Sequence, residues 1–129
     1  MKPEQRARKW IEKKAKKGVR SYPVGTVAFY GPDDSRATKV AAAILPYQDS
    51  EVTELRRWFG EAGDLRKNDK IFAEIAAFLW EQDVHSVVMV DGILGCPHEE
   101  GTDYPEGGVC PKCPYWAGRD RWAGKLKAY

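Results

Sequence analysis

The chain has 129 residues, of which 31% are charged and 12% aromatic, and its formal net charge at pH 7 is +2. A chain of this length can bury an apolar core as one domain without a metal. It contains no apolar run of the roughly 18 residues that span a membrane, and no apolar segment follows its charged N-terminus, so we expect neither a transmembrane helix nor a secretory signal.

Basic residues are concentrated at the N-terminus. Residues 1–20 hold nine basic and two acidic side chains, a net charge of +7, whereas the other 109 residues carry a net charge of −5. Such a segment favours contact with nucleic acid or another acidic surface, although a solvated terminus that only aids solubility has the same composition. The candidate nucleic-acid contacts in this segment are Arg6, Arg8, Lys9, Lys13, Lys16 and Lys17.

The first half of the chain predicts one helix and two strands. A helix is expected over 4–17, and since it is short and poor in apolar residues, Trp10 and Ile11 must either pack on the body or contact a partner. A strand is expected over 26–30. The alanines of 38–45 suit a helix, but the short length and the following proline suit a hairpin strand, which we favour.

The second half predicts a strand, a helix and another strand. Residues 52–59 form the first of these strands. Asn68 or Asp69 then caps a helix whose apolar residues recur at helical spacing through 71–82. The apolar run 87–90 is typical of a central strand covered on both faces, and the three elements together predict a right-handed parallel crossover.

These elements predict an α+β fold. We expect a small mixed β-sheet of three to four strands with one main packed helix, an N-terminal basic helix and a C-terminal zinc-bound loop. Along the chain this gives a basic helical arm over 1–20, an α+β core over 21–95, and a zinc-binding loop with an aromatic and basic tail over 96–129, all in one compact domain.

One short stretch holds all three cysteines of the chain and one of its two histidines. Cys96 and His98 form C-x-H, and Cys110 and Cys113 form C-x-x-C, which together offer the ligands of a Cys₃His zinc site. A two-residue gap lets both thiolates of the second pair face one ion, and the i, i+2 spacing of the first pair points both side chains to one side of an extended segment. The sequence therefore predicts one structural zinc ion.

The same stretch resembles the H-x-E…P-C-x-x-C signature of zinc-dependent nucleoside and nucleobase deaminases. The resemblance implies that His98, Cys110 and Cys113 hold zinc and that Glu100 moves the proton. The chain departs from the family because only nine turn-forming residues separate Glu100 from Cys110, and because valine precedes Cys110. In addition, Cys96 is available for the position that a reactive water would need, so we favour a structural site.

Two other chemistries are open to the cysteines. Cys110 and Cys113 could form a redox pair, but the residues after them do not resemble the helix that follows a thioredoxin-type motif. An iron–sulfur centre usually requires a fourth cysteine. Both hypotheses rank below zinc.

Charged and aromatic residues surround the predicted ligands. Glu99, Glu100 and Asp103 are interpreted as loop residues that hydrogen-bond around the site, for instance to the free ring N–H of a ligating histidine, with acid–base catalysis as the alternative. The tail offers further candidate nucleic-acid contacts, which could instead pair with the acidic loop. These tail residues are Trp116, Arg119, Arg121 and Trp122.

The expected function is that of a small zinc-stabilised binding protein, with DNA or RNA as the first candidate partner. A protein–protein adaptor with an apolar patch of Trp10, Trp58 and Trp122 is the alternative, and a small zinc-dependent metalloenzyme ranks third. No phosphate-binding glycine loop or nucleophile-elbow motif is present, which argues against an NTPase or hydrolase. Three cysteines in a metal-like spacing fit a reducing compartment, so we expect a cytoplasmic protein.

Overall fold

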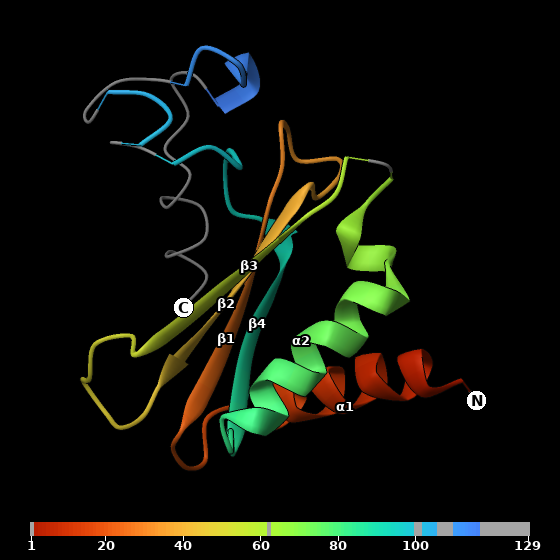
Figure 1. Cartoon of the computed structure of the whole chain (residues 1–129), viewed down its shortest axis with the longest axis vertical. Coiled ribbons are helices and arrows are strands. Elements are labelled where there is room, and N and C mark those ends of the chain that lie inside the picture. Colours follow the sequence, from red (N-terminus) through yellow and green to blue (C-terminus); the bar gives the residue numbers. More distant parts are fainter. Residues whose placement is uncertain (1, 62, 100–101, 106–109, 117–129) are drawn as a thin grey trace.

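The computed structural model describes residues 2–61, 63–99, 102–105 and 110–116. Within these ranges the fold consists of two helices and a four-stranded sheet (Figure 1), and short 3₁₀ turns lie at Leu65–Lys67 and Pro114–Trp116. In chain order the main elements are α1 (Pro3–Lys17), β1 (Val24–Tyr30), β2 (Lys39–Leu45), β3 (Glu54–Phe59), α2 (Asp69–Glu81) and β4 (Ser86–Ile93). The predicted α+β fold with a small mixed sheet is confirmed. No helix in the described ranges is long and apolar enough to cross a membrane.

The strand order is β3-β2-β1-β4, with β2 antiparallel to both of its neighbours and β4 parallel to β1. The strands β1, β3 and β4 therefore run in one direction. Their C-terminal ends lie at the same end of the sheet, which is referred to below as the C-terminal edge. At this edge Tyr30, Lys39 and Phe59 lie side by side in register. The segment that contains the cysteines follows β4 and leaves the sheet at the same edge (Figure 1).

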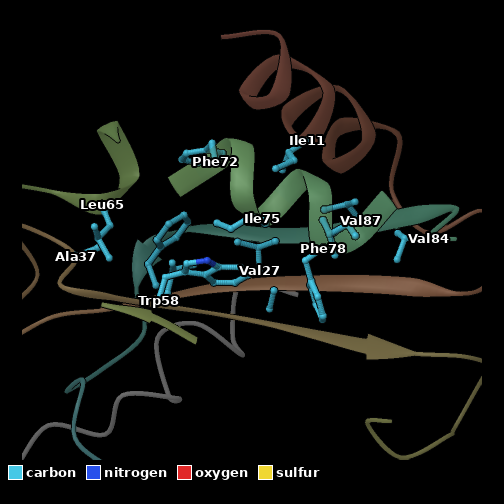
Figure 2. Packing of buried hydrophobic residues seen from close by; sticks show 14 of the residues in the cluster. Ile11, Val27, Ala37, Trp58, Leu65, Phe72, Ile75, Phe78, Val84 and Val87 are labelled. Carbon is cyan, nitrogen blue, oxygen red and sulfur yellow. The ribbon is translucent and has the colours of Figure 1, made fainter. Parts of the chain in front are cut away.

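Both helices cover one face of the sheet. Alternation along the strands turns Val27 of β1 and its register partner Ala42 of β2 toward the helices, and both are buried. Figure 2 shows Ile11 of α1, Ile75 of α2 and Val27 of β1 in successive layers of the core. The segment 38–45 is the predicted strand rather than a helix, because β2 pairs along its length with β1 and with β3.

The N-terminal helix packs on the body. Ile11 is fully buried, and Trp10 meets Trp80 of α2 edge-on with 5.9 Å between ring centroids. The guanidinium of Arg8 lies 2.8 Å from the Asp69 carboxylate. Of the two roles predicted for Trp10 and Ile11, packing on the body is the one that the structure shows.

The second helix begins where the sequence indicates. The Asn68 side chain accepts a 3.1 Å hydrogen bond from the Ile71 N–H, so Asn68 rather than Asp69 is the N-terminal cap of α2.

The prediction of a central strand over 87–90 is wrong. β4 lies at the edge of the sheet, with Val87 buried under the helices and Val88 38% exposed on the other face. A continuous apolar run does not distinguish a central strand from an edge strand that has one covered face. β3 and β4 do run parallel, but they occupy opposite edges with β1 and β2 between them.

The apolar patch predicted from tryptophans does not form as expected. Trp58 is only 8% exposed and packs edge-on against Phe78 of α2 at 6.1 Å between centroids. Trp10 is engaged with Trp80, and Trp122 lies outside the described residues. Successive residues of a strand point to opposite faces of the sheet. Phe59, which follows Trp58 in β3, therefore points away from the helices and is 67% exposed.

Candidate metal centre

Backbone hydrogen bonds fix the point at which the chain enters the site. Beyond the ends of β1 and β4, Leu94 donates to the Phe29 carbonyl at 2.8 Å and Gly31 donates to the Gly95 carbonyl at 2.9 Å. The next residue is Cys96, the first predicted ligand. Its position is therefore set by the sheet and not by the loop alone.

Cys96, His98, Cys110 and Cys113 lie close together and could bind one metal ion. Their potential ligand atoms are all within 4.8 Å of one another, and the three cysteines are buried. The Nδ1 atom of His98 lies 3.2, 3.4 and 3.5 Å from the Sγ atoms of Cys96, Cys110 and Cys113. Metal–sulfur and metal–nitrogen bonds of about 2.3 and 2.0 Å at a tetrahedral angle place such atoms about 3.5 Å apart.

Hydrogen bonding alone does not account for this arrangement. A ring nitrogen carries either one proton or one lone pair, so Nδ1 of His98 can form a hydrogen bond with only one of the three sulfurs. A cation at the centre would attract all four atoms at once. The three similar distances are those expected if the four side chains bind one shared cation.

The ionisation of the three thiols also favours a cation at this site. Burial raises the pKa of the Cys96 and Cys113 thiols above the ordinary value. Burial also opposes ionisation of Cys110, but hydrogen bonding by the backbone of Lys112 and by the neighbouring sulfurs lowers its pKa. The backbone N–H of His98 donates to the Cys96 sulfur at 3.2 Å. Thiolates are the metal-binding form, so a buried group of three sulfurs needs a cation to hold them ionised together.

Two basic residues of the sheet tie the site to the body. Lys39 of β2 donates from Nζ to the Pro97 carbonyl and to the Glu99 carboxylate, both at 3.1 Å, and Arg57 of β3 meets the same carboxylate at 2.6 Å. Lys39 is only 5% exposed. Its hydrogen bond, more than that of Arg57, lowers the pKa of Glu99. Neither basic residue was predicted for the site; the one signal in the sequence is a lysine at the start of an otherwise apolar strand.

The acidic residues near the ligands have separate positions. Glu99 pairs with the sheet, as described, and Asp103 accepts a 2.7 Å hydrogen bond from the Glu99 backbone N–H. Glu100, the residue that the deaminase resemblance singles out, lies outside the described residues. An ion held by all four Cys and His donors would have no open position, as in structural zinc sites.

In Figure 1, α1 lies in the lower half of the view, away from the segment that follows β4 and contains the cysteines. Arg6, Lys9, Lys13, Lys16 and Lys17 are exposed, and we call them the basic face. Arg8 is instead engaged with Asp69 and with the Phe72 ring, 4.4 Å from its centroid. Of the tail candidates, the Trp116 side chain and Arg119, Arg121 and Trp122 fall outside the described part of the chain.

Comparison of the chain with protein-family models, with curated proteins and with solved structures found no match.

Proposed function

We propose that the protein is a zinc-stabilised nucleic-acid-binding protein that contacts phosphates through the basic face of α1. The observation that carries the proposal is the placement of five basic side chains on one exposed side of a docked helix. Nucleic-acid backbones are lines of negative charge, and rows of lysine and arginine bind them by releasing condensed counterions.

The geometry of the helix supports this role. Successive residues turn by about 100°, so the basic face spans an arc of about 100° centred opposite the buried Ile11. At a rise of about 1.5 Å per residue it extends about 17 Å along the axis. The core contacts of Ile11 hold the row in a fixed direction, so the helix does not have to fold when it binds.

The charges of the basic face are free for a ligand. None of its five side chains forms an ion pair with another residue in the described ranges, in contrast to Arg8 with Asp69. The remainder of the chain is acidic, at −5 over 109 residues. This asymmetry would orient the protein so that α1 approaches an anionic partner.

Zinc is the metal that the donor set favours. Three thiolates and one imidazole in a tetrahedral arrangement are typical of structural zinc, whereas hard cations such as Mg²⁺ and Ca²⁺ take oxygen ligands. In this proposal the ion supplies no reaction; it holds the segments on either side of residues 100–109 together, beside the C-terminal ends of the parallel strands. Cysteines kept reduced for a metal fit the cytoplasm as the place where the protein acts.

Removing two charges of the basic face is expected to weaken nucleic-acid binding and to reduce its dependence on salt. For duplex DNA, the slope of log affinity against log salt should become shallower by about 1.8 in the Lys9→Ala/Lys13→Ala variant, because each phosphate contact contributes about 0.9. Alanine is a good helix former, so α1 should persist. Fluorescence anisotropy with a labelled duplex over a series of salt concentrations measures the slope.

The matched control is Arg56→Ala/Lys70→Ala, which removes two exposed positive charges from β3 and α2. It should leave the slope close to that of the wild type. A wild-type protein with no affinity for nucleic acid at low salt, or two double variants with equal slopes, would show that the basic face does not bind phosphates.

A further inference from the structure

Three hollows run along the junction between the open sheet face and the Cys/His cluster. The first has a volume of about 420 Å³ and the next about 250 Å³, and they share Phe59, Pro97 and Asp103. The third, of about 300 Å³, shares Lys39, Arg57 and Glu99 with the second. Since neighbouring hollows share lining residues, they lie next to one another beside the C-terminal ends of β1 and β3, and we call the three together the trough.

An aromatic ring lies at the centre of this trough. Phe59 lines both the first and the second hollow and is 67% exposed, whereas its neighbour Trp58 is buried in the core. The ammonium group of Lys39 lies 5.9 Å from the Phe59 ring centroid, which fixes a positive charge beside the ring. An exposed ring in a hollow with charged walls is a surface on which a flat aromatic ligand can stack.

The polar groups around the ring suit the edge of such a ligand. In the first hollow Arg36 donates to the Glu61 carbonyl at 2.7 Å, so its guanidinium is held in place with further N–H groups available. Lys112 adds a second donor, and the Asp103 carboxylate adds an acceptor. The hollow therefore offers both hydrogen-bond donors and acceptors. The edge of a nucleobase carries both as well, whereas a purely apolar or purely anionic ligand does not.

The lining of the trough carries more positive than negative side chains. In the second hollow the carboxylates of Glu99 and Asp103 accompany two cations, Lys39 and Arg57. The first hollow adds two cations, Arg36 and Lys112, and one further acid, Glu61. Over the three hollows four cations thus accompany three acids, and this net positive charge would attract a phosphate attached to a base on Phe59.

We infer that the trough binds one unpaired nucleotide of a single-stranded nucleic acid, with the base stacked on Phe59 in the first hollow and its phosphate beside Arg57 in the second. The inference rests on the proposed function for the kind of ligand, but it assigns a different surface from the basic face. Duplex nucleic acid would bind through α1 alone, because paired bases cannot enter the trough.

The test compares Phe59→Ala with Tyr47→Ala. Tyr47 lies between β2 and β3, lines none of the three hollows and has a similarly exposed ring, at 65%. Anisotropy with a labelled single strand should show an affinity about 5- to 150-fold weaker for Phe59→Ala, the range of one lost base stack, and near wild type for Tyr47→Ala. Phe59→Trp should retain binding. The salt slope and the affinity for a duplex should not change in any of the three variants.

Two results would overturn the inference, and they differ in what they say of the proposed function. If the wild type binds strands with the expected salt slope but Phe59→Ala binds as tightly as Tyr47→Ala, the trough does not hold a base and the basic face stands. If the wild type binds no oligonucleotide, the proposed function is wrong, and a titration with a nucleoside monophosphate decides the trough. Saturable NMR shifts at the Phe59 and Asp103 amides would support it, and their absence would rule it out.

Discussion

The Cys113→Ser variant is expected to be isolated with almost no zinc, whereas the wild type is expected to carry one zinc ion per chain. Cys113 is the most buried of the three cysteines, at 2% exposure, and its Sγ lies 3.5 Å from His98 Nδ1. A serine hydroxyl stays protonated at neutral pH and cannot replace a thiolate. Zinc affinity should fall by far more than the roughly 10- to 100-fold that follows the loss of a hydrogen-bond partner of a ligand. Elemental analysis and titration against a zinc chelator measure the loss.

The same variant should keep its helices and sheet. The buried cluster around Phe29, Ile75 and Leu79 is separate from the one that contains the cysteines. The far-ultraviolet circular dichroism of Cys113→Ser should therefore remain close to that of the wild type. Lys112→Ser, an exposed neighbour in the same turn, is the matched control and should retain its zinc. If Cys113→Ser retained one tightly bound ion, the proposed coordination would be wrong.

The Ile11→Ala variant is expected to lose about 2–5 kcal/mol of the free energy of unfolding. Ile11 is fully buried between α1 and the body, and truncation of a buried isoleucine removes apolar contacts and leaves a cavity. Urea unfolding followed by circular dichroism measures the change. Val52→Ala, at a residue that is 49% exposed in the β2–β3 connection, is the control and should lose less than about 0.5 kcal/mol.

The comparison of these two variants tests whether α1 is a structural part of the fold. A loss below about 1 kcal/mol for Ile11→Ala would mean that the helix contributes little to stability. The basic face would then lack the fixed support that the proposed function assumes. A large loss would show that α1 presents its charges from a rigid position.

Local patterns in the sequence predicted the helices and strands well, but they did not predict the order of the strands in the sheet or which side chains face the core. The helical spacing of apolar residues located α2, and Asn68 was one of the two caps considered. The position of β4 at an edge could not be predicted, because the same apolar run from Val87 to Val90 serves a strand with one or two covered faces. Likewise, sequence alone does not say which of two adjacent aromatics in β3 faces the core; burial under α2 selects Trp58 and leaves Phe59 exposed.

Part of the candidate site could likewise be predicted from the sequence, and part could not. Its four candidate ligands lie in two short motifs, and their spacing along the chain was enough to predict them. Lys39 and Arg57 could not, because they meet Glu99 only after the sheet brings residues 60 and 42 positions apart in the chain together. The trough around Phe59 also depends on this long-range contact. Local spacing thus predicted which Cys and His residues lie together, and tertiary structure was needed to find the surface beside them.

X-ray absorption spectroscopy on protein purified under reducing conditions tests the central claim most directly. We expect one zinc per chain, with three sulfur atoms at about 2.3 Å and one nitrogen at about 2.0 Å. An oxygen atom in place of one of these ligands would indicate an open position and a catalytic ion. A metal-free protein with a disulfide between Cys110 and Cys113 would contradict the zinc centre altogether.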